Sequence, residues 1–243
     1  MSIAQSQAAS VPPFVPAELE PDYDRFITED EKPVDSIYSE RQQRLLTDAL
    51  CASWSAPQGQ PHLAATDVGL FYSVHEPAIA PDVMLSTGVA PPSEWTGKKN
   101  RSYFTWLMGK CPDLTVEVVS NQEGGELTEK KGKYAHIGIP YYVVWDPALL
   151  LSKTPLSCFV LKGKKYDPCE PWFPDLELGV TEWDGEYDGM TCRWLRFCDQ
   201  AGHVLPTGIE RAKIAEQRAE SAEQRAALLA EKLRALGVEP DPA

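Results

Sequence analysis

The segment from Pro112 to Pro147 constrains the fold most, because it joins two strongly apolar runs through an amphipathic stretch. Residues 114–119, LTVEVV, are rich in β-branched side chains and predict a strand. Residues 126–137, ELTEKKGKYAHI, have the apolar spacing of a helix, and Gly138 stands where a helix commonly ends. The run YYVVWDP at 141–147 is apolar almost throughout, so it predicts a strand that is buried on both faces.

One residue interrupts the apolar character of the first strand. Glu117 stands between Val116 and Val118, in the middle of the run. A carboxylate inside an apolar strand costs free energy unless it has a partner or binds a metal ion. The alternative is a half-exposed strand from which Glu117 points to solvent, and the pattern alone leaves both interpretations open.

The helix after this strand carries three lysines, which helical geometry distinguishes. With about 100° of rotation per residue, one apolar face is formed by Leu127, Tyr134 and Ile137. Lys130 falls about 30° from the centre of that face, Lys131 roughly 70° away, and Lys133 on the opposite side. We therefore expect Lys130 to face the strands. The alternative is an amphipathic lysine that extends past the edge of the core.

A second acid could come from any of three Pro-Asp pairs, at residues 81–82, 112–113 and 174–175. Asp113 precedes Glu117 by four residues on the same strand, a span of about 13 Å, which is too long for both carboxylates to bind one ion. The acid must then come from a neighbouring strand. Asp82 lies in such a predicted strand and is favoured over Asp175, which lies in a turn-like Trp-Pro region.

Two carboxylates, a strand carbonyl such as that of Val118 and a nearby lysine are the parts of a metal-dependent hydrolytic site. Magnesium prefers hard oxygen ligands and keeps several of its waters. It would polarise a phosphodiester and help to deprotonate a bound water. The lysine would position that water or stabilise charge on the phosphate.

Composition narrows the range of functions. The chain has 36 acidic and 23 basic residues, a formal net charge of −13, which argues against a broad basic face for nucleic acid but not against a nuclease with local basic patches. No apolar run of about 18 residues and no secretory signal is present, so we expect a cytoplasmic protein without a membrane span. The 6 cysteines form no C-x-x-C pair and predict reduced thiols. Motifs of small-molecule enzymes, such as G-x-G-x-x-G, a P-loop, G-x-S-x-G or H-E-x-x-H, do not occur.

The rest of the chain before residue 206 predicts a flexible end and several short elements. Residues 1–20 are rich in Ala, Ser and Pro and predict a flexible tail. Ser39 is expected to cap an amphipathic helix over residues 40–54. The inner face of this helix would carry Leu45, Leu46, Ala49 and Leu50. Strand candidates are residues 66–74 and 78–86, and residues 156–198 predict short strands that extend the same domain.

A heptad repeat dominates the C-terminal part of the chain, where AEQRAES is followed by AEQRAAL. The spacing of seven and four residues defines a seam of Ala215, Ala219, Ala222, Ala226, Leu229, Leu233 and Leu236. This seam predicts a helix from about residue 210 to about residue 236 that joins the protein into a homodimer or larger homo-oligomer. The alternative is a single exposed helix rich in Ala, Glu and Arg.

The blocks E-V-V-S-N, G-G-E, K-x-x-x-Y-A and G-I-P-Y-Y-V-V-x-D-P, all within residues 112–147, resemble the Uma-two family of proposed restriction endonucleases. The resemblance extends from near Phe26 to about Asp199, and the Glu/Gln/Arg/Ala tail ending in LRALGVEP also looks like tails in this family. It implies the PD-(D/E)XK nuclease fold. This is an α/β (α+β) domain with a restriction-endonuclease-like central mixed sheet flanked by helices, here followed by a C-terminal helical or coiled-coil tail.

The resemblance also implies roles for individual residues. Asp82 matches the first catalytic aspartate of the family and Glu117 the second acidic position, which together would hold magnesium or manganese. The simplest form of the motif has its lysine two residues after the acid, where this chain has Val119. The family places its lysine on the next helix, at the position matched by Lys130. Glu40, on the first helix, is a candidate for an additional acid.

Two functional classes stay open. In the first, the chain is a magnesium-dependent DNA endonuclease; in the second, it is a non-catalytic DNA-binding or scaffolding relative that assembles through its coil. DNA contacts would rely on local basic residues, which could equally be ordinary solvated charges: Lys98, Lys99, Arg101, Lys110, Lys131, Lys162, Lys164 and Lys165. The expected organisation is a tail over residues 1–20, a nuclease-like domain over 21–205 and a C-terminal helix over 206–243.

Overall fold

The computed structural model describes residues 19, 21–22, 36–94, 96–120 and 125–236. Six strands form a central sheet in the order β1-β3-β5-β6-β7-β8. Their bounds are β1 (His62–Ala65), β3 (Val83–Thr87), β5 (Leu114–Val118), β6 (Tyr141–Trp145), β7 (Leu156–Lys162) and β8 (Lys165–Pro168). Within this sheet β5 and β6 run parallel, because the helix between them carries the chain back across the sheet, and the other neighbouring strands are antiparallel. The sheet is therefore mixed, as predicted.

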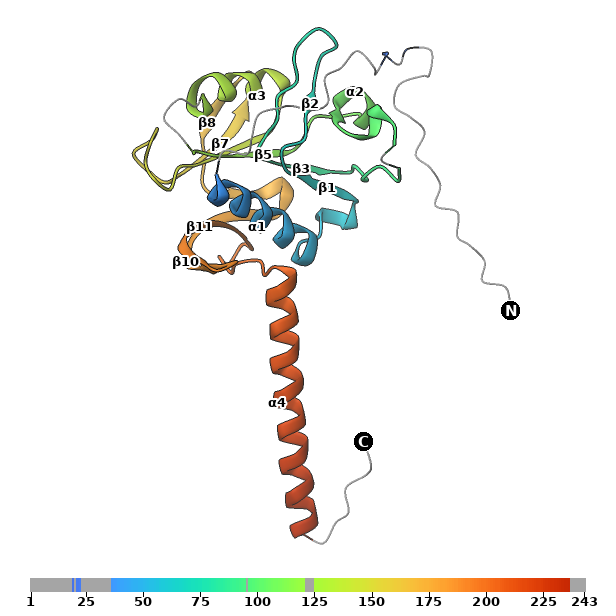
Figure 1. The fold of residues 1–243 in the computed structure, drawn as a ribbon, viewed down its shortest axis with the longest axis vertical. Helices are drawn as coiled ribbons and strands as arrows, with labels where there is room; N and C mark the ends of the chain where they lie inside the picture. The colour runs from blue at the N-terminus through green and yellow to red at the C-terminus, as the bar shows by residue number, and fades with distance from the viewer. Residues whose placement is uncertain (1–18, 20, 23–35, 95, 121–124, 237–243) are drawn as a thin grey trace, which may run out of the picture.

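Helix α1 (Ile37–Ser53) covers one face of the sheet (Figure 1). Its inward side chains are those expected from the sequence: Leu45, Leu46, Ala49 and Leu50 are buried. The predicted cap was wrong, because Ser36 rather than Ser39 starts the helix. The Ser36 hydroxyl accepts a hydrogen bond from the Ser39 amide at 3.0 Å, which places Ser39 inside the first turn.

The opposite face of the sheet is covered by a π-helical turn, η5 (Glu126–Lys130), which continues directly into α3 (Lys131–Ile137). The helix predicted over 126–137 is thus present, but its first turn is wider than an α-helix. Gly138 ends it with a φ of 91°, a left-handed conformation that glycine adopts without steric cost. Figure 1 shows α3 and α1 on the two sides of the sheet.

Alternation along β5 assigns its side chains to the two faces. Val116 and Val118 pack in the hydrophobic cluster that contains Leu46 of α1. Glu117 points the other way, toward Tyr134 of α3. Both faces of β5 are buried along its whole length, so the carboxylate of Glu117 lies inside the protein.

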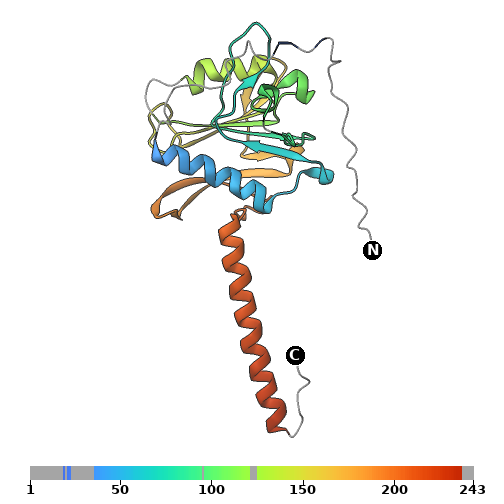
Figure 2. The same cartoon turned by 45° about the vertical axis from the view of Figure 1, so that its right-hand side comes forward.

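A second sheet lies beyond α1 and encloses that helix from the other side (Figure 2). It has the order β11-β10-β9, with β9 (Trp172–Phe173), β10 (Leu178–Tyr187) and β11 (Met190–Cys198). The side chain of Gln42 in α1 is joined to the backbone of Leu195 by two hydrogen bonds of 2.8 and 2.9 Å. The β-rich region after residue 156 thus packs on the same body, as expected.

The region between α1 and β5 differs most from the prediction. Residues 66–74 contain only a two-residue strand, β2 (Leu70–Phe71), which pairs in parallel with β4 (Tyr103–Phe104). Strand β1 was not expected, because His-Leu-Ala-Ala lacks β-branched residues and alternation. The remaining elements are short: η3 (Pro57–Gly59), η4 (Lys98–Asn100), α2 (Thr105–Met108) and η6 (Pro174–Leu176).

Helix α4 (Gly208–Ala235) projects from this body as a single long rod (Figures 1 and 2). A capping box starts it: the Thr207 hydroxyl accepts from the Glu210 amide, and the Glu210 carboxylate accepts from the Thr207 amide. Glu210 also pairs at 2.7 Å with Arg196 of β11, whose side chain is almost fully buried. No described residue of α4 is buried.

Two further findings concern the ends of the chain and membranes. The tail predicted over residues 1–20 lies outside the described residues, apart from Leu19. Among the helices that the structure describes, none combines the length and apolar character needed to span a bilayer.

Candidate active site

Two acidic residues lie opposite each other where β3 begins and β5 ends. Val83 pairs with Val116 in an antiparallel register, so the preceding residue, Asp82, stands across from Glu117. Directly opposed residues of antiparallel strands point to the same face of the sheet. Asp82 Oδ2 accepts a hydrogen bond of 2.6 Å from the Val118 amide, which fixes this carboxylate at the end of β5.

Glu117 is fully buried, and both of its oxygens have donors. Tyr134 donates its hydroxyl to Oε1 in a short hydrogen bond, and Lys130 Nζ lies 2.7 Å from Oε2. Glu117 therefore does not point to solvent from a half-exposed strand. Both donors come from the helical segment that packs on this face of the sheet, four residues apart and one turn from each other.

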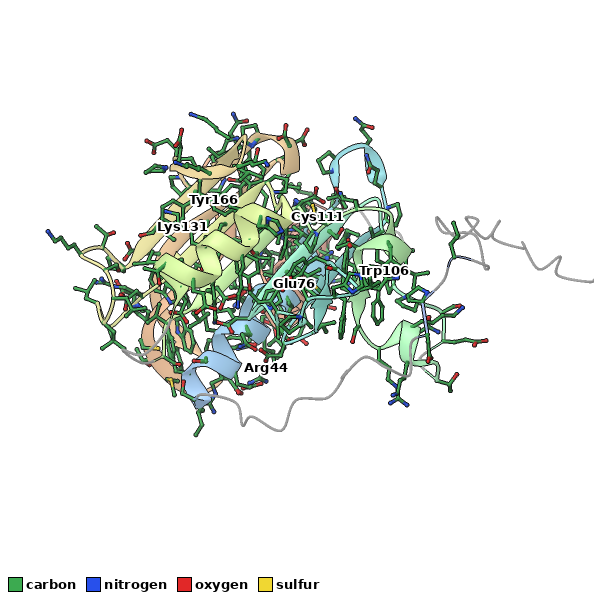
Figure 3. All side chains as sticks on the ribbon, turned by 90° about the horizontal axis from the view of Figure 1, so that it is seen from above. Arg44, Glu76, Trp106, Cys111, Lys131 and Tyr166 are labelled. Carbon is green, nitrogen blue, oxygen red and sulfur yellow. The ribbon has the colours of Figure 1, made fainter. Side chains whose placement is uncertain are left out.

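The three lysines of the helix have three different environments. Lys130 contacts Glu117, as the helical geometry predicts. Lys131 places its ammonium 3.4 Å from the centre of the Phe159 ring, and partial burial lowers its pKa. Lys133 forms an exposed ion pair of 2.7 Å with Glu129. Figure 3 shows Lys131 and Tyr166 near α3, well away from Arg44 on α1.

Electrostatic coupling links the groups of this cluster. Burial raises the pKa of Asp82 well above its ordinary value, the nearby Glu117 carboxylate raises it further, and the Val118 amide lowers it only in part. Burial also raises the pKa of Glu117, although Lys130 and Tyr134 counteract the shift. Burial by itself would lower the pKa of Lys130, but the carboxylates around it raise that pKa, so the lysine stays an ammonium.

Sequence reasoning missed a third carboxylate and the role of a tyrosine. Glu126 Oε1 lies 3.3 Å from Lys130 Nζ, and only 10% of the Glu126 side chain is exposed. Its i,i+4 spacing from Lys130 was the available signal. Tyr134 was counted as part of the apolar face, because its ring is apolar, but its hydroxyl contacts Glu117.

The competing aspartates have other partners. Asp113 accepts hydrogen bonds from Lys110 and from the backbone and hydroxyl of Thr87. Asp175 accepts a hydrogen bond of 2.8 Å from the Tyr141 hydroxyl. Both are engaged in local structure.

The structure does not bring Glu40 to the cluster. Glu40 lies on α1, which covers the face of the sheet opposite to the one that Glu117 faces, and it pairs with Arg44 at 3.1 Å. The expectation of an additional acid from the first helix is therefore not met by this residue. The direction in which Glu40 points depends on which face of the sheet α1 covers. A local sequence pattern does not determine that face.

The backbone of Val118 is close to Asp82. In an extended strand, the N–H and C=O groups of one residue point to the same side of the strand. This is why two paired residues of antiparallel strands can exchange two hydrogen bonds. Because the Val118 amide donates to Asp82, the Val118 carbonyl faces the same edge of β5.

Of the basic residues expected to contact DNA, Lys98 and Lys99 lie in η4, and Arg101 follows it directly. Arg101 lines a small cavity together with Met84, two residues after Asp82 on β3. This part of the basic loop is therefore on the same face of the sheet as Asp82. Lys131 instead packs over an aromatic ring, as described above.

The chemistry of the cluster fits a hard divalent cation. Lys130 contacts Glu117 and Glu126, and Asp82 stands opposite Glu117, so three carboxyl groups share one ammonium. Carboxylate and carbonyl oxygens are the ligands that magnesium prefers. Among the residues that the structure describes, no three His, Cys, Asp or Glu side chains already converge as metal ligands, because Lys130 stands between Glu117 and Glu126.

Comparison with known proteins gives one result. A family model named Uma2, with the description "Putative restriction endonuclease", matches residues 26–183. This match includes β1 to β9, α1, α3 and all the carboxylates of the cluster. No curated protein and no solved structure matches the chain.

Proposed function

The chain belongs to the Uma2 family and has its restriction-endonuclease-like fold, and from this premise we propose that it is a metal-dependent endonuclease that hydrolyses phosphodiester bonds in DNA. The observation that carries the proposal is the pair of opposed carboxylates, Asp82 and Glu117, with the Lys130 ammonium against Glu117. These are the residue types that such a reaction needs: oxygen ligands for a metal and a fixed positive charge.

In this proposal Asp82 and Glu117 hold magnesium or manganese, and the Val118 carbonyl is a third oxygen beside them. When bound, the metal supplies charge to polarise the phosphodiester and to lower the pKa of a water. Tyr134 and Lys130 orient the Glu117 carboxylate through its two oxygens. The Val118 amide does the same for Asp82.

Lys130 acts in this proposal as a donor and a positive charge, because its raised pKa keeps the proton on Nζ. It would orient the attacking water through an N–H and offset the charge that develops on the phosphate. A general base would need a neutral amine, which the surrounding carboxylates disfavour.

DNA is the proposed substrate, and Lys98, Lys99 and Arg101 are the proposed contacts. Their loop lies on the face of the sheet that carries Asp82, as the cavity shared by Arg101 and Met84 indicates. The net charge of −13 makes such local contacts necessary, because phosphate binding depends on basic residues near the site. Lys131 is a weaker candidate, since its ammonium is directed at Phe159.

We further propose that α4 joins two copies of the chain, so that two active sites could act on both strands of a duplex. Leu229 and Leu233 of the heptad seam are 60% and 37% exposed in the single chain. We also propose the domain boundaries of the chain: a tail over residues 1–20, a nuclease-like domain over 21–205 and a C-terminal helix over 206–243. A non-catalytic scaffold that binds DNA and assembles through α4 is the second candidate function, which the same exposed seam favours.

The proposal is tested by incubating supercoiled plasmid with the purified chain in magnesium, in manganese and in excess chelator. We expect nicked and linear DNA with either metal and none with the chelator. Glu117→Gln, purified in parallel, should leave the plasmid intact, because the carboxylate that would hold the metal is gone. Binding of the plasmid without any cleavage would favour the scaffold instead.

A further inference from the structure

Glu126 is a buried acid whose hydrogen bonding is incomplete. Its side chain is nine-tenths buried, and Lys130 contacts Oε1, whereas Oε2 is buried and has no partner among the described residues. A buried carboxylate oxygen without a donor costs free energy, and native proteins rarely keep one unless an ion or water satisfies it. Among the described residues nothing occupies this oxygen, so an ion or a water can bind it.

The position of Glu126 is fixed by features that a surface acid would not have. Its backbone carbonyl accepts a hydrogen bond of 2.7 Å from the buried Tyr142 hydroxyl. It begins the π-helical turn η5, and turns of this kind are frequent at functional sites. The wide turn directs Glu126 and Lys130 to the same place, next to Glu117 of the central sheet.

The groups around Lys130 indicate which ligand fits this oxygen. Lys130 Nζ lies 2.7 Å from Glu117 and 3.3 Å from Glu126, and Asp82 stands across the two strands from Glu117. Three carboxyl groups thus share one ammonium, and clustered carboxylate oxygens are the ligands that a hard divalent cation prefers.

We propose that Glu126 is a third carboxylate of the metal centre, and that its Oε2 binds the divalent cation together with Asp82 and Glu117. This inference rests on the proposed function, because it assumes that the centre takes a metal. In the metal-free protein the Lys130 ammonium stands between Glu117 and Glu126 as an internal counter-ion.

The test is a manganese titration of the full-length chain by calorimetry, for wild type, Glu126→Gln and Glu129→Gln. Glu129 is the matched control, since it lies on the same turn but is exposed and pairs with Lys133. We expect Glu126→Gln to weaken manganese binding by at least about tenfold, and Glu129→Gln to change it by less than about twofold. Equal affinity of Glu126→Gln and wild type would overturn the inference and leave the proposed function intact. A wild type that binds no manganese would overturn both.

Thermal unfolding in chelator separates a ligand from a structural acid. If Glu126 is a metal ligand, the melting temperature of Glu126→Gln without metal should equal or exceed that of wild type, because one unsatisfied buried charge is gone. Added manganese should then raise the melting temperature of wild type and of Glu129→Gln, but scarcely that of Glu126→Gln. A lower melting temperature for Glu126→Gln in chelator would show a structural counter-ion of Lys130 and overturn the inference.

Discussion

Asp82 is held by a backbone amide and destabilised by its neighbours at the same time. Burial and the Glu117 carboxylate raise its pKa, so the folded metal-free protein binds a proton at Asp82 more tightly than the unfolded chain does. The proton on Asp82 therefore stabilises the folded protein at low pH. This contribution to the free energy of unfolding is lost as the pH rises from the ordinary pKa of an aspartate to the raised pKa of the folded state.

Asp82→Asn should therefore stabilise the metal-free protein, and more so at higher pH. The amide oxygen of asparagine can still accept from Val118, while the buried charge is removed. The free energy of unfolding in urea, measured in chelator at about pH 5 and about pH 8, should differ from wild type more at the higher pH. An equal loss of stability at both values would contradict the electrostatic account. With saturating manganese the order should reverse, because only the wild type gains binding energy.

The sequence was sufficient to identify Asp82, Glu117 and Lys130 as a group. An acid in an apolar strand, an acid at the start of another strand and a lysine on the inner face of a helix are all local patterns. Tyr134 and Glu126 were not recognised, because their contacts depend on the π-turn and on how closely the helix approaches β5. Glu40, the candidate for an additional acid, was not brought to the cluster, because α1 covers the other face of the sheet and that choice of face is a tertiary property.

At the scale of elements, the segment η5–α3 has to keep Lys130 and Tyr134 over β5. One glycine within α3 and one at its end offer a direct test of this helical segment. Gly132 is exposed in the helix, and an added Cβ would meet no atom within 4 Å. Gly138 has equally open surroundings but a φ of +91°, which disfavours any side chain.

We expect Gly132→Ala to stabilise the protein by roughly 0.5–1 kcal/mol, because alanine loses less backbone entropy in a helix. Gly138→Ala should destabilise it by about 1–2 kcal/mol, because the left-handed conformation is strained for alanine. Urea unfolding of the two variants measures both values. The same sign for both would mean that the helix does not end at Gly138 in solution.

Strands with a strong local sequence pattern were predicted, whereas a strand without such a pattern was missed. β5 and β6 are β-branched or aromatic and nearly wholly apolar, so they were recognised with close bounds. β1 has no such pattern, and it pairs with β3 at the edge of the sheet. The cap of α1 was misplaced by one turn, because Ser36 and Ser39 are chemically equivalent candidates and only the backbone geometry distinguishes them.

At the scale of the whole molecule, α4 is the feature that most needs a partner. It is anchored at one end by the Arg196–Glu210 pair, and its described side chains are otherwise largely exposed. The helix itself could be predicted from the repeat. Its role in assembly stays a prediction, because the heptad pattern does not say what covers the seam.

Sedimentation equilibrium of full-length variants tests that role without disturbing the anchor. We expect wild type to be a dimer and the double variant Leu229→Glu/Leu233→Glu to be a monomer, because charge in an apolar seam opposes association. Leu228→Glu is the control, since Leu228 is exposed but lies outside the seam. Identical masses for all three proteins would contradict dimerisation through α4.

Cleavage of supercoiled plasmid in magnesium by Lys130→Ala and Lys133→Ala, beside wild type, tests whether Lys130 acts in DNA hydrolysis. Both variants remove a lysine from the same helical segment, but only Lys130 contacts Glu117, while Lys133 pairs with Glu129 at the surface. We expect Lys130→Ala to lose at least about a hundredfold in rate, whereas Lys133→Ala should stay within about twofold of wild type. Equal rates for the two variants, or no cleavage by wild type, would contradict this expectation.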